Sequence, residues 1–267
     1  MPAAGEPLVA ATADGVALAL RRHVAAGRRR AVALCTHAMM ASGAYLDGRL
    51  APDLARRGVT VYVLDWRGHG ASRPPHPRSG SWQFDDYVAA DLPAAIRAVC
   101  ADAGVRPRDL VYVGHSLGGL VGLAAFGVGA APPPAQLWLV ATSVWLPGPA
   151  GPRGRRAAMR LARAVARVVG YAPVRALRAG TDDEPRAYVE QLAGWALSGR
   201  WTGRGGVDFL ARAHALDVPA TAVVGAGDRW CTPADARALA PRARLVLVPG
   251  DHFGAVRAVA PLVAGAL

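Results

Sequence analysis

The sequence predicts an α/β fold in which a mostly parallel sheet carries helices on both faces. Runs of strand-forming residues alternate with helical runs along most of the chain, which is typical of this class. Several predicted strands, such as AVALCTH and GVTVYVLDW, are continuously apolar, as expected of parallel strands that are buried on both faces. The chain has 267 residues, of which 52% are hydrophobic, enough for one such domain with an insertion.

The first 145 residues follow this alternation, starting from a β-hairpin whose turn is Asp14-Gly15. Asp85 is expected to cap the helix that follows it, and Pro93 either to kink that helix or to mark a second start within it. In chain order we predict a hairpin at 8–12 and 16–23, a strand at 31–37, a helix at 45–57, a strand at 58–66, a helix at 86–103, a strand from 110 that leads into a helix, and a strand at 136–144.

The alternation breaks at Leu146 and resumes after residue 206. Between them we predict a helical lid insertion, 146–206, with the linker PGPAGPRG, a basic helix at 155–169 and a second helix at 185–197. The last part, 207–267, completes the core that begins with residues 1–145. Its predicted elements are a strand at 219–228, a helix at 233–240 that Thr232 caps and Pro233 begins, a strand at 244–252, and a helix at 253–264.

The chain is strongly basic, with a formal charge of +12, which by itself favours nucleic acid or an anionic membrane as a partner. All 31 basic residues are arginine, however, and alanine is abundant, which indicates the codon bias of a GC-rich genome. The arginines are also spread along the chain. We therefore expect no nucleic-acid partner.

Cys35, Cys100 and Cys231 are widely separated, so the sequence predicts neither a disulfide framework nor a zinc site. The seven histidines show no H-x-x-x-H spacing, so we expect no metal, and we expect no cofactor. The N-terminal stretch lacks a signal-peptide pattern, and no apolar run has the length of a membrane span. We expect a cytoplasmic protein without a stable membrane anchor; its oligomeric state is not indicated.

The stretch LVYVGHSLGG at 110–119 is the strongest functional signal. Strand-forming residues lead directly into a G-x-S-x-G turn around Ser116, and an apolar run of small residues follows, which predicts strand, sharp turn and helix. Gly114 and Gly118 are small enough for the strand and the helix to approach each other. A glycine-rich turn with a capping serine would share the pentapeptide, but the strand–turn–helix context favours a nucleophile.

Asp228 and His252 are predicted to complete a catalytic triad with Ser116. Each of the three stands at the C-terminal end of a predicted strand. These ends share one edge of a parallel sheet, where ligands bind. A serine hydroxyl needs an imidazole to take its proton, and the imidazole needs an acid on its other nitrogen. Asp251 is a less favourable acid because it cannot easily bond the ring of its own neighbour.

The oxyanion that such chemistry forms needs backbone N–H donors. We predict one at Leu117, directly after the nucleophile, and one at Met39, in the loop after an earlier strand. His37, His69 and His115 are expected to order turns and loops, since none of them follows a late strand.

With this G-x-S-x-G turn, this set of triad residues and these oxyanion donors, the chain resembles a serine-dependent α/β-hydrolase of the esterase, monoglyceride lipase and lysophospholipase branch. The order of Ser116, Asp228 and His252 is the one expected of that fold. The resemblance implies the same donor at Met39, although Ala38 stands where the family usually has glycine, and it implies that Asp65 forms a turn. The matching motifs are HAMM at 37–40, DWRGHGAS at 65–72, GHSLGG at 114–119, GAGD at 225–228 and GDHF at 250–253.

The insertion has two possible roles. The stretch between Ser143 and Gly206 contains eleven arginines and four acidic residues, a net charge of +7. This charge fits a solvated outer face, or an electropositive cap that favours anionic ligands. Alternatively, apolar residues of its helices line a pocket for an acyl chain. In that case we expect changes at Tyr188, Leu192 or Trp195 to alter chain-length preference more than stability.

The sequence thus predicts a carboxylic ester hydrolase that acts on a small acyl ester or thioester through an acyl-enzyme. Acyl transfer, carbon–carbon bond hydrolysis and perhydrolysis by the same triad are alternatives, as is a non-catalytic ligand-binding protein of this fold. The acyl chain and the leaving group are not indicated.

Overall fold

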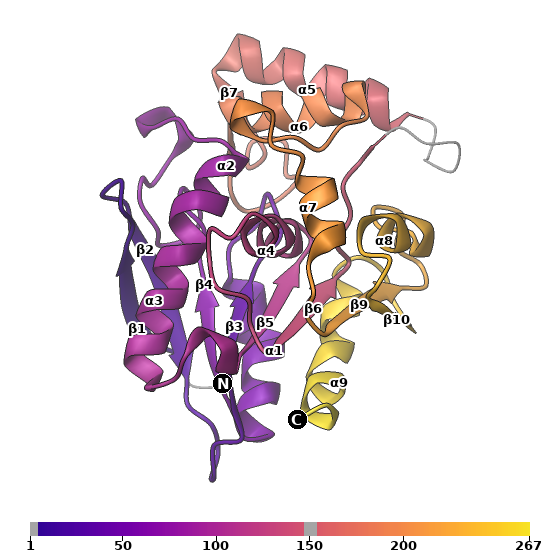
Figure 1. Ribbon diagram of the computed structural model, residues 1–267. Helices are drawn as coiled ribbons and strands as arrows, with labels where there is room; N and C mark the ends of the chain where they lie inside the picture. Colours follow the sequence, from indigo (N-terminus) through magenta and orange to yellow (C-terminus); the bar gives the residue numbers. More distant parts are fainter. Residues whose placement is uncertain (1–4, 147–153) are drawn as a thin grey trace.

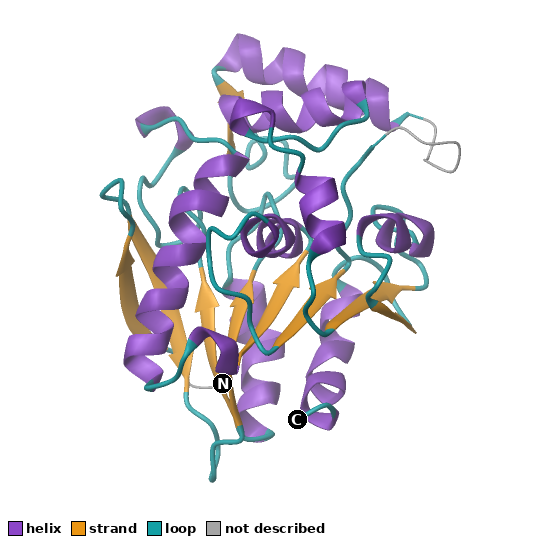
Figure 2. Ribbon diagram, in the orientation of Figure 1, coloured by secondary structure: helices purple, strands orange, loops and turns teal. Residues whose placement is uncertain are grey.

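The computed structural model describes residues 5–146 and 154–267, and it confirms the predicted α/β class (Figures 1 and 2). The eight-stranded sheet has the order β1-β2-β4-β3-β5-β6-β9-β10. Strand β2 pairs antiparallel with β1 and with β4, and the other neighbours pair parallel. The strands are β1 (Glu6–Ala11), β2 (Ala17–His23), β3 (Ala31–Thr36), β4 (Val59–Leu64), β5 (Leu110–His115), β6 (Gln136–Val140), β9 (Ala220–Gly225) and β10 (Arg244–Val248).

Helices cover both faces of the sheet, so alternate residues of one strand belong to different cores. In β3, Val32 and Leu34 pack in the core that includes α3, α4, α7 and α8, whereas Ala33 and Cys35 pack in the core that includes α1 and α9. These helices are α1 (Ala44–Arg56), α3 (Leu92–Ala103), α4 (Leu117–Gly127), α7 (Phe209–Ala215), α8 (Pro233–Leu239) and α9 (Val259–Gly265). Helix α7 was not predicted from the sequence.

The described part of the insertion lies at the end of the sheet toward which the arrowheads of the parallel strands point (Figures 1 and 2). It contains α5 (Arg155–Val169) and α6 (Arg186–Ser198), close to the predicted helices, and a pair of two-residue strands, β7 (Tyr171–Ala172) and β8 (Glu184–Pro185), that the sequence pattern did not predict. The predicted linker lies outside the described residues except for its last glycine. No helix of the described residues is long and apolar enough to cross a membrane.

The predicted helix at 86–103 is divided in the structure. A short helix, α2 (Phe84–Asp86), leads into a π-helical turn, Tyr87–Asp91, and then into α3, in which Pro93 is the second residue. The interruption therefore precedes the proline, because the start of a helix tolerates a residue without an N–H group. Short 3₁₀ turns occur at Pro77–Ser79, Pro107–Asp109, Arg204–Gly206 and Gly254–Ala258.

The predicted cap at Asp85 is wrong. Asp86, not Asp85, accepts the Gln83 N–H, at 2.7 Å, and so closes the start of α2. The Asp85 carboxylate instead accepts the N–H of Arg204, also at 2.7 Å. The cap of α8 is confirmed, since Thr232 accepts the N–H of Asp235, whose carboxylate accepts the Thr232 N–H in return.

The last two strands are shorter than predicted. Strand β9 ends at Gly225 and β10 at Val248, so Asp228 and His252 lie on the loops that follow, not at the strand ends. Both loops emerge at the C-terminal edge of the sheet, where the predicted site lies.

Candidate active site

Ser116 lies in a sharp turn between β5 and α4. Its φ of +51° and ψ of −110° are unfavourable for a residue with a side chain, and they separate an extended strand from a helix within one residue. The Ser116 N–H donates to the Val140 carbonyl of β6 at 2.9 Å, which ties the turn to the sheet.

The glycines of this motif permit the close contact of α4 with the sheet. A Cβ atom on Gly118 would lie 2.3 Å from Thr36 Oγ1, and one on Gly119 would lie 2.0 Å from Thr142 Oγ1. Any side chain at these positions would push the helix away from the strands and would move Ser116 with it.

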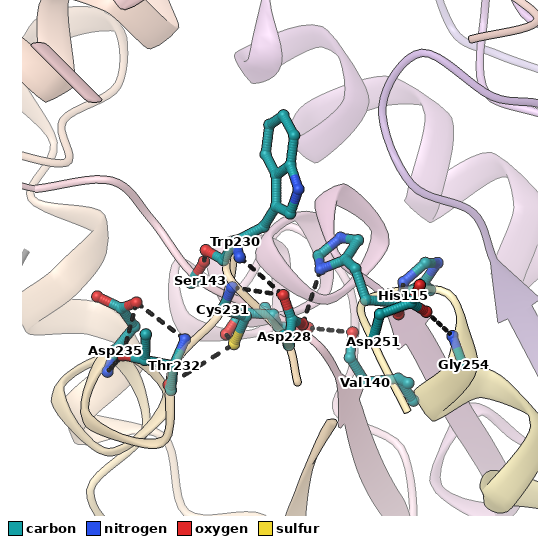
Figure 3. Close-up of polar contacts among 12 residues, drawn as sticks. His115, Val140, Ser143, Asp228, Trp230, Cys231, Thr232, Asp235, Asp251 and Gly254 are labelled. Atoms are coloured by element: carbon teal, nitrogen blue, oxygen red, sulfur yellow. Dashed lines mark hydrogen bonds and ion pairs between the residues drawn. The ribbon is translucent and has the colours of Figure 1, made fainter. Parts of the chain in front are cut away.

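Asp228 and His252 form a hydrogen bond, with 2.9 Å between His252 Nδ1 and Asp228 Oδ2. The other Asp228 oxygen accepts the N–H groups of Trp230 at 2.7 Å and Cys231 at 3.0 Å (Figure 3). The carboxylate is buried, while the imidazole is partly exposed. Asp228 is therefore fixed by its own loop and holds one nitrogen of a ring whose other nitrogen is available for chemistry. Asp251, the less favoured acid, bonds the Gly254 N–H instead, at 2.7 Å (Figure 3).

Ser116 and His252 are both partly exposed at this edge. Among the hydrogen bonds of residues 5–146 and 154–267, none joins Ser116 Oγ to the His252 ring. Catalytic hydrogen bonds of this type are often long without substrate and tighten in the Michaelis complex.

The N–H groups of the two predicted oxyanion donors, Leu117 and Met39, lack the kind of acceptor that the N–H of Ala38 has. The N–H of Leu117 is the first of α4 and has no acceptor within that helix. The N–H of Met39 has no acceptor among the described residues, whereas the N–H of Ala38 donates to the Tyr45 hydroxyl at 2.9 Å. Of these two neighbouring N–H groups, only that of Met39 is without an acceptor among the described residues.

A directed chain of hydrogen bonds links this loop to the His252 loop. His115 Nε2 lies 3.1 Å from the His252 carbonyl, which can only accept, so this nitrogen carries the proton. Burial and the nearby His252 hold the pKa of His115 well below its usual value, so His115 Nδ1 is unprotonated. It therefore accepts from the Tyr45 hydroxyl, 2.6 Å away, whose oxygen accepts the Ala38 N–H.

His37 orders the end of β3. Its Nε2 accepts the Trp66 N–H at 3.0 Å, and its Nδ1 is 2.7 Å from the Ala38 carbonyl, so the ring is neutral with the proton on Nδ1. Burial, aided by the charge of His69, lowers the pKa of His37 to about 4, in agreement with this geometry. The His37 carbonyl accepts the Gly118 N–H at 3.2 Å and so joins the loop to α4.

Asp65 has the turn-forming role that the family resemblance implies. Its two oxygens accept the N–H of Gly43 at 2.7 Å and that of Ala71 at 3.0 Å. Arg21 bonds both oxygens of this buried carboxylate. Although burial acts in the opposite direction, Arg21 lowers the pKa of Asp65, which keeps the anion in place.

Tyr188 and Trp195 of α6 lie between the insertion and the core. Both are buried: the Tyr188 ring packs edge-on against Tyr87, and the Trp195 ring packs against Phe84. Leu192 is half-buried at the same contact. Large aromatic side chains in such a contact carry much of its packing energy, so we expect substitution of Tyr188 or Trp195 to cost stability as well. The expectation that substrate preference changes more than stability stays a prediction.

A partly exposed aromatic pair lies beside His252. The rings of Trp145 and Trp230 are stacked with centroids 5.2 Å apart, and the guanidinium of Arg155 lies over Trp145 at 5.1 Å. Trp230 is 50% exposed, and its ring centroid is 6.4 Å from that of His252. These residues were not predicted from the sequence, although one tryptophan follows a predicted strand end and the other lies two residues after the predicted acid of the triad, which is a usable signal.

Two further residues of the site carried no signal in the sequence. Tyr45 lies in a predicted helix, and Glu184 lies in the insertion, 144 positions from the residue it bonds, Met40.

In the described part of the chain, no group of His, Cys, Asp and Glu side chains could hold a metal ion.

Residues 27–246 match the model of a family described as "Serine aminopeptidase, S33". Among related sequences, the chain is 32% identical over 135 residues to triacylglycerol lipase 2 of Arabidopsis thaliana and 32% identical over 133 residues to lipase member N of Mus musculus. Each match covers 43% of this chain and only 31% and 32% of those relatives, so the chain spans about a third of their length.

Solved structures share the fold over almost the whole chain. A hydrolase from Pseudomonas aeruginosa PA01 is 25% identical with a TM-score of 0.64, and 98% of each chain is covered. An esterase from Exiguobacterium antarcticum is 14% identical with a TM-score of 0.68, covering 97% of this chain and 98% of that one. The thioesterase domain from the curacin biosynthetic pathway is 17% identical with a TM-score of 0.64, and 99% of each chain is covered.

Proposed function

Because the chain belongs to the serine aminopeptidase S33 family of α/β-hydrolases, we propose that it is a serine hydrolase that cleaves a carboxylic ester or thioester through an acyl-enzyme. The observation that carries the proposal is the strained Ser116, presented between β5 and α4 at the sheet edge where Asp228 orients His252. The names of the relatives, lipases among the sequences and an esterase and a thioesterase among the structures, favour an ester or thioester over a peptide.

In the proposed mechanism, His252 Nε2 takes the proton of Ser116 while Oγ attacks the acyl carbon. The Met39 and Leu117 N–H groups stabilise the oxyanion, and Asp228 holds the imidazolium that forms. When the oxyanion collapses, the bond to the leaving group breaks, and His252 gives that group its proton. A water molecule, deprotonated by His252, then attacks the acyl-enzyme, and the acid leaves as Ser116 regains its proton.

We further propose that the insertion selects the acyl substrate. Its position beyond the strand ends supports this role, and Leu192, which is only half-buried, is the better candidate for contact with the acyl chain. The charged-cap alternative is weakened because four arginines of the insertion are already paired with acidic side chains: Arg155 with Asp235, Arg167 and Arg186 with Glu190, and Arg204 with Asp86.

The test combines an active-site label with a substrate panel. A fluorophosphonate is expected to modify Ser116, as located by peptide mass spectrometry, and p-nitrophenyl esters of increasing chain length are expected to be hydrolysed. Ser116→Ala should lose both the label and about 10⁴-fold or more of kcat/KM. Labelling at a different serine, or hydrolysis undiminished in Ser116→Ala, would sink the proposal. A p-nitroanilide of alanine tests the peptide alternative that the family description raises.

A further inference from the structure

Met40 follows the proposed oxyanion donor and has an unusual backbone conformation. Its φ is +59°, in the left-handed region that residues with side chains rarely occupy, so it persists only where the surroundings hold it. Its N–H donates to Glu184 Oε1 at 2.6 Å, and its carbonyl accepts the Thr181 N–H at 2.9 Å. Both partners come from the insertion, so the core alone does not fix this residue.

The insertion approaches Met40 so closely that a glycine is required. A Cβ atom on Gly180 would lie 2.1 Å from the Met40 carbonyl oxygen. Because that oxygen belongs to the backbone, it cannot move aside as a flexible side chain could. The segment at residues 180–184 is thus shaped to meet the oxyanion loop, the name we use for residues 37–40.

The side chain of Glu184 is held in place by the buried, protonated ring of His69. It is fully buried, and His69 Nε2 lies 3.2 Å from the same oxygen that bonds Met40. His69 Nδ1 lies 3.0 Å from the Arg67 carbonyl, so both His69 nitrogens face acceptors and both carry protons. The other Glu184 oxygen, Oε2, is buried without a hydrogen-bond partner among the described residues. Burying a charged group with one oxygen unsatisfied costs stability, which suits a residue retained for its effect on the site.

We propose that Glu184 is a positioning residue that acts through Met40: by holding the N–H of Met40, it aims the preceding N–H, that of Met39, at the oxyanion of the reacting acyl group. The inference rests on the proposed function and extends it, because it makes the insertion part of the oxyanion site. The insertion then contributes to the rate of the chemical step as well as to the choice of substrate.

The test compares Glu184→Ala with Glu190→Ala, a matched control on α6 whose side chain is partly exposed and paired with Arg167. In Glu184→Ala, kcat on a p-nitrophenyl ester should fall about 10- to 100-fold. The reason is that a misdirected Met39 N–H stabilises the oxyanion of the transition state less well. KM should change by no more than about threefold, and the affinity for a trifluoromethyl ketone, which forms a tetrahedral oxyanion on the serine, should fall in parallel with kcat. Glu190→Ala should leave all three values unchanged.

Two more variants separate the hydrogen bond from general damage. Glu184→Gln keeps an oxygen that accepts from Met40 and should restore most of kcat, while Gly180→Ala keeps Glu184 but displaces its segment and should lower kcat. Both remain informative if Glu184→Ala does not fold, which circular dichroism would report. The inference is overturned if folded Glu184→Ala keeps wild-type kcat and ketone affinity, or if Glu184→Gln is as impaired as Glu184→Ala.

Two readouts distinguish failure of this inference from failure of the proposed function. Labelling and turnover of the wild-type protein test the proposed function alone, so an active wild type beside an unimpaired Glu184→Ala contradicts only the role of Glu184. Hydrogen exchange of the Met40 amide needs no substrate. It should be slow in the wild type and at least tenfold faster in Glu184→Ala, and equal rates would contradict the inference whatever the activity.

Discussion

The Asp228–His252 pair and the oxyanion loop lie at the same edge of the sheet, but different parts of the chain hold them. Asp228 is held by its own loop, because it accepts the N–H groups of Trp230 and Cys231, two and three residues further on. The carbonyl of His252 accepts from His115 of the core. The oxyanion loop is held from both sides, by Tyr45 of the core at Ala38 and by Glu184 of the insertion at Met40. The Asp228–His252 half of the site therefore depends on local structure and on the core, whereas the oxyanion loop also depends on how the insertion packs on the core.

The largest expected effect concerns the Asp228–His252 half. In Asp228→Asn, the amide oxygen can still accept from the loop, but its NH₂ group then faces His252 and favours the wrong tautomer. We expect kcat to fall about 10⁴-fold with little change in the unfolding free energy, as for the analogous change in serine proteases. Steady-state kinetics and urea unfolding measure both quantities.

Asp251→Asn is the matched control, because this exposed carboxylate accepts the N–H of Gly254 and does not bond the His252 ring. Its kcat should stay within about threefold of the wild type. If instead Asp251→Asn abolished turnover while Asp228→Asn retained it, the acid of the triad would be Asp251.

A smaller effect is expected where the insertion packs on the core. Trp195 is buried against Phe84, and its indole N–H donates to the Thr202 carbonyl at 2.8 Å. Trp195→Ala should lower the unfolding free energy by about 3–5 kcal/mol, since it removes a large packed ring and leaves a cavity. Leu161→Ala, a change at an exposed position of α5, should alter it by no more than about 0.5 kcal/mol. A stable Trp195→Ala with altered chain-length preference would show that this ring lines the acyl pocket after all.

The smallest effect is a pH dependence at the contact between Glu184 and the core. Burial opposes the charged form of His69, but Glu184 outweighs it and raises the pKa of His69 to about 9. A raised folded-state pKa stabilises the protein fully below the unfolded value of about 6.5, and this contribution is lost as the pH rises through about 9. The other groups near His69 are Asp182, the neutral His37 and the ring of Tyr87.

We therefore expect the unfolding free energy to fall by about 1–3 kcal/mol between about pH 7 and pH 10, measured by urea unfolding. His69→Gln should show a smaller fall over the same range. If both proteins lost the same stability, the charge of His69 would not hold the insertion to the core.

The sequence by itself determined the elements whose causes are local. The G-x-S-x-G turn at Ser116 follows from neighbours in the chain, since the glycines beside it admit the close contact of strand and helix. The cap of α8 at Thr232 is set by residues three positions apart, and the apolar strands of the parallel sheet are continuous runs. The parallel sheet also places the loops that follow its strands at one edge, which made Asp228 and His252 predictable as a pair.

Only the tertiary structure decided what depends on contacts between distant segments. The bonds from Glu184 to Met40 and from Gln191 to the chain at Phe84 join residues more than 100 positions apart, and no periodicity or spacing records them. The burial of Tyr188 and Trp195 likewise depends on how the insertion packs on the core. The physical reason is that hydrogen-bond geometry and packing are set by positions in space, whereas patterns in a sequence report only the preferences of residues for their local surroundings.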